Sequence, residues 1–148
     1  MRPALLPSLA AVCIGILTGI GLLTFGYAKG LSYLTDSPEA CANCHVMNEQ
    51  LSGWRKSSHR QAAVCNDCHA PAGFAPKYAV KALNGFFHSL AFTTGRFPGH
   101  IQIGERNRRI TETACLKCHA GMVESIRSAA AHRGEPSHCL RCHQSPGH

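Results

Sequence analysis

The pentapeptide Cys41-Ala42-Asn43-Cys44-His45 decides how this chain of 148 residues folds, because its pattern recurs three more times. Cys-x-x-Cys-His is the attachment signature of a c-type haem: both thiols bond to the porphyrin, and the histidine reaches one face of the iron. Zinc also binds Cys-x-x-Cys pairs, but it does not require a histidine directly after each second cysteine. The sequence therefore predicts four haems, numbered one to four with their motifs. The other three motifs are Cys65-Asn66-Asp67-Cys68-His69, Cys115-Leu116-Lys117-Cys118-His119 and Cys139-Leu140-Arg141-Cys142-His143.

The composition limits both the core and the partners of the chain. Aromatic residues make up only 7% of it, so we expect the porphyrins to fill the centre of one small domain, with helices and much irregular structure around them. The formal charge of +7 would ordinarily suggest a nucleic acid partner. Four haems, however, bring eight propionates, or roughly −8, and the basic side chains are expected to neutralise these. Because eight of the nine cysteines lie in haem motifs, a disulfide framework is not expected.

Residues 5–28 contain no charged side chain. A helix of this length spans about 36 Å, enough to cross a bilayer. The apolar core of a cleaved secretory signal is shorter, about 7–15 residues. We therefore expect a single uncleaved transmembrane helix. Because haem attachment of this kind is completed outside a bacterial inner membrane, residues 1–4 should be cytoplasmic, 29–40 a linker and 41–148 a periplasmic domain.

Glycine pairs in this helix leave self-association open. Gly15 and Gly19 form one GxxxG pattern, and Gly26 and Gly30 form another. Patterns of this kind let two membrane helices approach closely, although glycine is common in such helices in any case.

The spacing of the motifs indicates a duplication. Cys41 and Cys65 are 24 residues apart, Cys115 and Cys139 are also 24 apart, and 50 residues separate the two pairs. We therefore expect two di-haem units, 41–69 and 115–143.

Segment 74–94 between the two units is predicted to be an amphipathic helix. Lys77, Lys81, Asn84 and His88 fall within about 60° of one another on a helical wheel, with apolar residues opposite. Such a helix lies on a membrane surface, or packs its apolar side against haem with its lysines in solvent. The pattern alone does not choose between these two arrangements.

A transfer haem usually takes a second strong axial ligand, and the chain offers several. The side chain of Met47 is either a thioether ligand or a core residue. His148 is the last residue, and iron ligation would tie it down. His59 and His132 precede the following motif by six and seven residues. The remaining histidine candidates are His88, His100 and His138.

These features resemble the NapC/NirT group of membrane-anchored, quinol-oxidising tetrahaem cytochromes, and within it the small subunit of cytochrome c nitrite reductase. The resemblance covers the whole chain. Besides the motifs and their spacing, it rests on 44–47 (CHVM), 58–59 (SH), 65–71 (CNDCHAP), 81–82 (KA), 84–85 (NG), 88–89 (HS), 91–93 (AFT) and 107–109 (NRR).

The resemblance implies that menaquinol is oxidised at the membrane and that electrons pass singly to a periplasmic multihaem subunit, which reduces nitrite to ammonium. Two alternatives stay open: a quinol-oxidising donor to another reductase, such as nitrate reductase, and a passive tethered carrier. By resemblance Lys81 lines the quinol pocket, with Lys77 a weaker candidate. His88 stands where some members have an aspartate, so it either accepts the quinol proton or ligates haem one.

The resemblance also implies the axial ligands. Met47 would bind haem one, while His45 would not bind iron. His148 would pair with His119 on haem three, and His59 with His143 on haem four. His69 would hold haem two together with a lysine of the partner or an internal histidine, for which His132 is our candidate.

Overall fold

The computed structural model describes residues 5–132 and 138–148, and in these residues it contains helices and loops but no strand. The predicted mainly helical fold with much irregular structure is confirmed. Short 3-10 helices lie at Gly30–Leu34, His45–Met47 and Ser58–Gln61. The α-helices are α1 (Leu5–Tyr27), α2 (Pro38–Cys41), α3 (Asn48–Lys56), α4 (Cys65–His69), α5 (Phe74–Thr94), α6 (Glu105–His119), α7 (Glu124–His132) and α8 (Cys139–Cys142).

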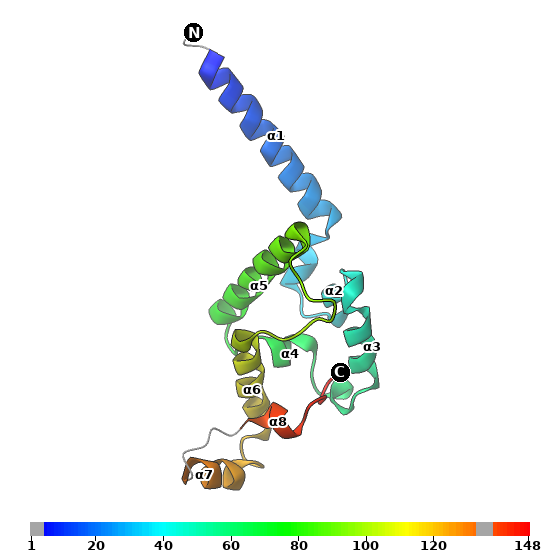
Figure 1. The fold of residues 1–148 in the computed structure, drawn as a ribbon, viewed down its shortest axis with the longest axis vertical. Helices are drawn as coiled ribbons and strands as arrows, with labels where there is room; N and C mark the ends of the chain where they lie inside the picture. Colours follow the sequence, from blue (N-terminus) through cyan, green and yellow to red (C-terminus); the bar gives the residue numbers. More distant parts are fainter. Residues whose placement is uncertain (1–4, 133–137) are drawn as a thin grey trace.

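Helix α1 extends away from the other helices (Figure 1). Its 23 residues are all exposed, and it is long and apolar enough to cross a membrane. At its end the chain turns back sharply, and a Cβ on Gly30 would overlap the Phe25 ring. Gly30 of the Gly26/Gly30 pattern therefore packs against Phe25 of the same chain. A Cβ at Gly15 or Gly19, by contrast, would have no atom within 4 Å.

Helix α5 coincides with the predicted amphipathic segment 74–94. Pro76 is tolerated because it lies in the first turn, where the backbone N–H has no helical partner. The helix ends at Gly95, whose φ of 66° favours glycine, and the N–H of Arg96 bonds to the carbonyl of Ala91 at 3.0 Å. This is a Schellman end, which satisfies the last free carbonyls.

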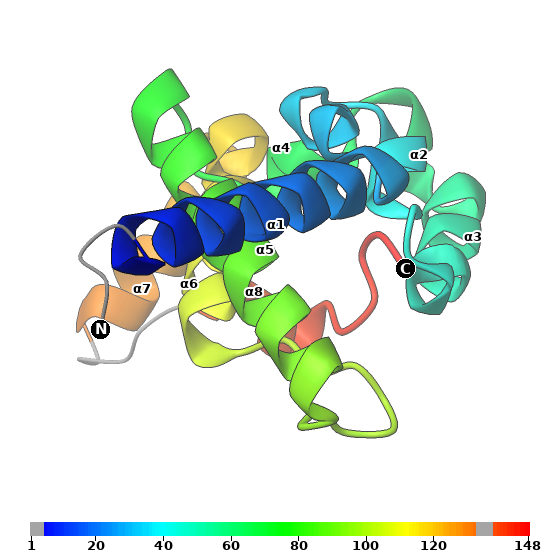
Figure 2. The ribbon, with the colours of Figure 1, turned by 90° about the horizontal axis from the view of Figure 1, so that it is seen from above.

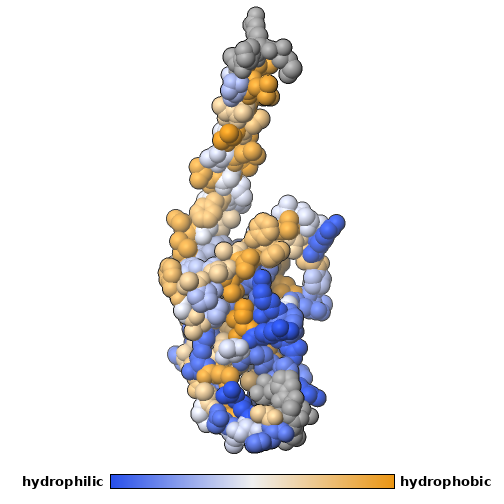
Figure 3. Space-filling model, turned by 90° about the vertical axis from the view of Figure 1, so that its left-hand side faces the viewer, coloured by the Kyte–Doolittle hydropathy of each residue, from blue (hydrophilic) through white to orange (hydrophobic). Residues whose placement is uncertain are grey.

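The polar side of α5 faces the protein and its apolar side is exposed. Tyr78 Oη donates to the carbonyl of Leu34 at 2.9 Å, and the neighbouring lysines bond to the segment that follows Leu34. On the opposite side Leu83, Phe86, Phe87 and Leu90 are 46–63% exposed. Figure 3 shows the orange, hydrophobic surface of α1 continuing over the adjoining part of the domain. The lysines are therefore not free in solvent, and the apolar side is available to a membrane surface.

Few side chains are buried in the described residues. The buried apolar side chains are Ala40, Ala70 and Ala114, and Thr111 is the buried polar one. Large residues of the kind that normally form a core are absent from this set. The chain by itself therefore supplies little hydrophobic stabilisation, and the expectation that haems form the centre stays a prediction.

Helix α3 and the C-terminus lie together on one side of the domain, and α7 lies on the other side (Figures 1 and 2). The last residues of the chain therefore run back towards a helix that lies about 95 residues earlier in the sequence.

Candidate functional site

The four motifs lie next to one another in sequence order. The thiol of Cys41 hydrogen-bonds to that of Cys65 and raises its pKa. Cys115 likewise lies beside Cys139, whose pKa is raised first by burial and then by the charge of Cys115. The second and third motifs meet at Cys68 and Cys118, which lie close enough to interact electrostatically. The first cysteine of each motif therefore meets the first cysteine of the motif 24 residues away.

Residues inside and beside the motifs tie neighbouring motifs together. Lys117 Nζ donates to the carbonyls of Asp67 and Ala70, both at 2.8 Å, which joins α6 to α4. Glu112 on α6 accepts the backbone N–H groups of Cys139 and Leu140, at 2.6 and 3.1 Å. The carboxylate thus satisfies two free donors at the start of α8. The variable positions of the haem motif therefore fix how the motifs sit on one another.

Two pairs of histidine rings meet across the domain. His69 and His148 have ring centres 5.9 Å apart and planes inclined by 21°. His59 and His119 have ring centres 6.2 Å apart and planes inclined by 72°. The donor set thus fits covalently bound haem, since each pair joins a motif histidine to one outside the motifs. In these contacts His148 lies beside His69 and His59 beside His119, whereas the iron ligands that the resemblance implied, His148 with His119 and His59 with His143, stay predictions.

Other predicted ligands lie elsewhere. Met47 ends a 3-10 turn directly after the first motif and is half-buried, whereas His45 is exposed. His132 ends α7 and is exposed, and its assignment to haem two stays a prediction. His143 follows α8 and is exposed.

Asp36, in the linker after α1, connects α5 to the first two motifs. Lys77 Nζ lies 2.5 Å from Asp36 Oδ2, and Lys81 Nζ lies 2.8 Å from the carbonyl of Thr35 and 3.7 Å from Asp36 Oδ1. Asn66 Nδ2, in the second motif, donates to Asp36 Oδ1 at 2.7 Å. The hydrogen bond from Lys77, with help from Asn66 and the two charges, holds the pKa of Asp36 below its usual range. The pKa of Cys41 is lowered first by its hydrogen bond with Cys65 and then by the charge of Lys81, so this lysine lies close to the first motif.

These contacts predict a pH dependence with a definite sign. Because the pKa of Asp36 is lowered on folding, its contribution to stability is present above the usual carboxyl range and is lost as the pH falls through the lowered pKa. The Asp36→Asn variant should therefore unfold at a lower temperature than the wild type at pH 7. The difference should shrink as the pH falls through the usual carboxyl range and vanish once the pH lies below the lowered pKa of Asp36, where both chains lack this charge. Thermal unfolding of the haem-loaded protein across this pH range measures it, and a difference that persists at low pH would contradict the assignment.

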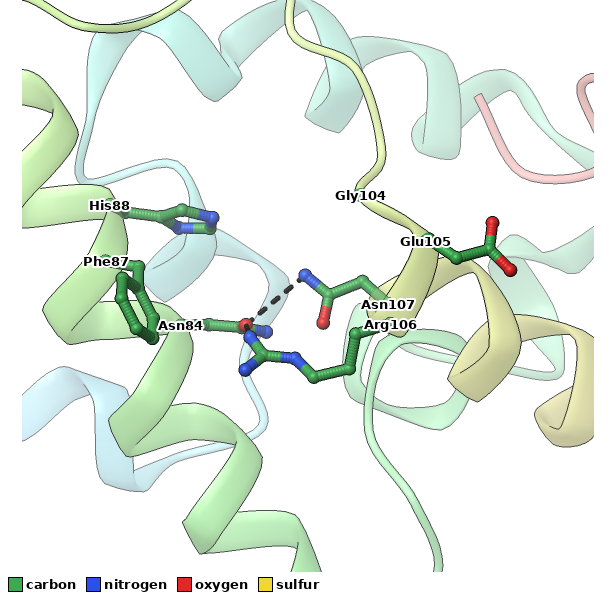
Figure 4. Close-up of a pocket in the computed structure, with 7 residues that line it drawn as sticks. All are labelled: Asn84, Phe87, His88, Gly104, Glu105, Arg106 and Asn107. Atoms are coloured by element: carbon green, nitrogen blue, oxygen red, sulfur yellow. Dashed lines mark hydrogen bonds between the residues drawn. The ribbon is translucent and has the colours of Figure 1, made fainter.

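His88 lies two turns beyond Lys81 on α5, about 10.5 Å along the helix axis. It lines an open pocket of about 360 Å³ at the start of α6, with Asn84, Phe87, Gly104, Glu105, Arg106 and Asn107 (Figure 4). Asn84 Oδ1 accepts from Arg106 Nη2 at 2.5 Å and Asn107 Nδ2 at 3.2 Å, which fastens α6 to α5. Lys77, Lys81 and His88 thus share one side of α5, but His88 faces a different neighbour from the two lysines.

Asp36 was not predicted from the sequence as part of the site. Asp36 precedes the first motif by five residues and has no pattern of its own, and its partners Lys77 and Lys81 lie 41 and 45 residues later. The two lysines themselves could have pointed to an acidic partner, because two lysines one turn apart on a helix that approaches a membrane need a negative charge nearby.

Comparison with known proteins agrees with these features. The chain matches the NapC/NirT cytochrome c family, N-terminal region, over residues 3–148. It is 36% identical over 146 residues to the cytochrome c-type protein NrfH of Wolinella succinogenes, which covers 93% of this chain and 82% of that protein. It is 30% identical over 121 residues to the cytochrome c nitrite reductase subunit NrfH of Nitratidesulfovibrio vulgaris, covering 82% and 72% of the two chains.

A solved structure is also similar. It is a chain of the crystal structure of the cytochrome c nitrite reductase NrfHA complex bound to the HQNO inhibitor. The TM-score is 0.64 with 27% identity, and the match covers 90% of this chain and 87% of that one. With the family match over nearly its whole length, this chain belongs to the NapC/NirT cytochrome c family.

Proposed function

We propose that this protein is a membrane-anchored cytochrome with four covalent haems that oxidises menaquinol and passes the electrons to a periplasmic multihaem nitrite reductase. One observation carries the quinol assignment: Lys81, whose side chain is only 16% exposed, stands next to the first haem motif on a helix with an exposed apolar side. A lipid-soluble substrate reaches that helix from the membrane, and the ammonium group is held where a quinol oxygen would arrive.

Three side chains have roles in the proposed reaction. Menaquinol releases two electrons and two protons to become menaquinone, and the haems accept the electrons one at a time. Lys81 donates a hydrogen bond to a quinol oxygen and orients it, while Asp36 keeps the Lys81 and Lys77 side chains in place. His88 accepts a proton, since imidazole gains and loses protons near neutral pH. In this proposal His88 is not an iron ligand, and Met47 binds haem one.

The contacts between motifs support an order for electron transfer. Because the motifs lie side by side in sequence order, the haems that they would hold could carry electrons from the first motif, beside Lys81, to the fourth. The nitrite reductase partner is proposed from the relatives, because one is a subunit of cytochrome c nitrite reductase and the similar solved structure is a complex of that enzyme. The N-terminus lies in the cytoplasm and the domain in the periplasm, where haem attachment is completed.

Purification from native membranes tests the partner. The full chain should copurify with a multihaem subunit, and nitrite should reoxidise the quinol-reduced haems of the complex. Copurification with a different reductase, whose substrate reoxidises the haems while nitrite does not, would overturn the nitrite assignment.

Asp36 should affect the quinol reaction through Lys81. The Asp36→Asn variant keeps a polar side chain but removes the charge that holds both lysines, so we expect a several-fold slower reduction of the haems by a menaquinol analogue. Glu39→Gln is a matched control, since Glu39 bonds to Arg55 at 3.3 Å. Equal rates for both variants and the wild type would show that Asp36 does not position Lys81.

A further inference from the structure

We propose that the carboxylate of Glu112 on α6 lowers the reduction potential of the haem at the fourth motif, which makes that haem a stronger electron donor. The proposal rests on the covalent haems put forward above and is independent of the quinol and nitrite assignments. Glu112 lies outside all four motifs. Its contact with the start of the fourth motif carries the proposal.

Glu112 holds the first two residues of the fourth motif with both of its carboxylate oxygens. Oε2 accepts the backbone N–H of Cys139 at 2.6 Å, and Oε1 accepts that of Leu140 at 3.1 Å. These N–H groups belong to the first turn of α8, where no helical carbonyl is available to them. Because the Cys139 thiol is one of the two that attach the haem, the carboxylate is fixed beside that point of attachment.

No cation offsets this carboxylate within residues 5–132 and 138–148. Arg108 and Arg109, four and three residues earlier on the same helix, instead pair with Glu105 at 4.0 and 2.9 Å. Glu112 and Cys139 are both half-buried. A charge at such a position acts on its neighbours with less screening than a charge in water.

The charge of Glu112 affects the neighbouring thiols in the direction that the proposal requires. The pKa of Cys139 is raised mainly by burial, and the charges of Cys115 and Glu112 raise it further. The pKa of Cys115 is raised by burial and by the charge of Cys68, and Glu112 again adds to the rise. In both cases the carboxylate disfavours the gain of a negative charge at an atom to which a haem is attached.

The same physics gives the direction of the redox effect. Reduction of a haem iron from Fe(III) to Fe(II) adds one electron and therefore one negative charge. A fixed anion stabilises the ferric form relative to the ferrous form, so the reduction potential falls. Charges and hydrogen bonds outside the axial ligands are among the means by which proteins set such potentials. A haem of lower potential is reduced less readily and, once reduced, passes its electron on more readily.

Lys117, five residues later on α6, carries the opposite charge at the contact between the second and third motifs. Its Nζ donates to the carbonyls of Asp67 and Ala70. Its charge opposes the rise in the pKa of Cys68 that burial and Asp67 cause. Removing this cation should therefore lower a haem potential, whereas removing the charge of Glu112 should raise one. Since both side chains also join neighbouring motifs, opposite shifts separate an effect of charge from an effect of packing.

The experiment is an optical redox titration of the purified full chain, with mediators and with dithionite as the reductant. In Glu112→Gln one potential should become more positive, so that at a fixed applied potential the ferrous-to-ferric ratio of that haem rises several-fold. The potential that is missing from a chain with Cys139→Ser and Cys142→Ser identifies it as the fourth haem. Glu112→Asp keeps the charge and should stay close to the wild type.

Glu124→Gln is the matched control for the change in net charge. It removes the same charge from an exposed position on α7, where Glu124 pairs with Arg127 at 3.4 Å, and it should leave all four potentials unchanged. Lys117→Gln should shift a potential to a more negative value.

The number of haems per chain is measured first. Fewer than four haems in the wild-type chain would contradict the proposed function and this inference together. Four haems with the same potentials in Glu112→Gln and the wild type would overturn this inference alone. A shift of the same sign in Glu112→Gln and Lys117→Gln would also overturn it, because loosened packing between the motifs would then explain both changes.

Discussion

Exchanging Lys81 for alanine is expected to slow reduction of the haems by a menaquinol analogue by roughly 10²–10³-fold, the usual cost of losing one preorganised donor at a reacting oxygen. The ammonium group is fixed by the carbonyl of Thr35 at 2.8 Å and by Asp36 at 3.7 Å, and its side chain is mostly buried. Removing it leaves the quinol oxygen without that donor. Stopped-flow absorbance of the full chain in liposomes, followed at the haem bands, measures the rate.

Two controls separate this effect from damage to the fold. Dithionite needs no quinol pocket, so it should reduce the haems of Lys81→Ala and of the wild type equally. Lys56→Ala removes the same kind of side chain from an exposed position at the end of α3 and should leave the quinol rate unchanged. If Lys81→Ala is reduced by the quinol as fast as the wild type, the pocket lies elsewhere.

Replacing all eight motif cysteines by serine is expected to abolish folding of the domain after α1. The described residues bury only three apolar side chains, all alanines. This removes little apolar area from water compared with the stability of about 5–15 kcal/mol that a domain normally has. The covalent haems must supply the rest. Far-UV circular dichroism and limited proteolysis of the full chain in detergent should show helix α1 retained and the remainder unfolded and rapidly cleaved.

A smaller change is expected when one haem is lost. Cys139→Ser with Cys142→Ser should leave three haems per chain and most of the helix signal, because Lys117 still joins the third motif to the second, and Asn66 still joins the second motif to Asp36 in the linker. A stable, protease-resistant domain in the serine variant without haems would contradict the view that haems form the core.

Features that depend on local pattern could be predicted from the sequence. The apolar run 5–28 became α1, and segment 74–94 became α5, because length, periodicity and the flanking Gly95 are local properties. The side of α5 that faces the protein was left open. The structure shows that Lys77 and Lys81 face Asp36, a choice that depends on a residue about 40 positions earlier in the chain.

Long-range pairing could not be read from spacing. His59 and Pro146 are 87 residues apart and yet share a hydrogen bond. Whether the terminal histidine meets His69 or His119 depends on how the tail lies against Gly53, and motif spacing carries no information about that contact. The resemblance identified the set of candidate ligands, and which of them share an iron stays a prediction.

Menaquinol-driven reduction of the wild-type chain tests the central claim most directly. A menaquinol analogue should reduce the haems of the full chain in liposomes. HQNO, the inhibitor bound in the related complex, should block that reduction. Dithionite should still reduce the inhibited protein. If the haems respond to dithionite but not to the quinol, with or without HQNO, the protein is a tethered carrier and the quinol assignment is wrong.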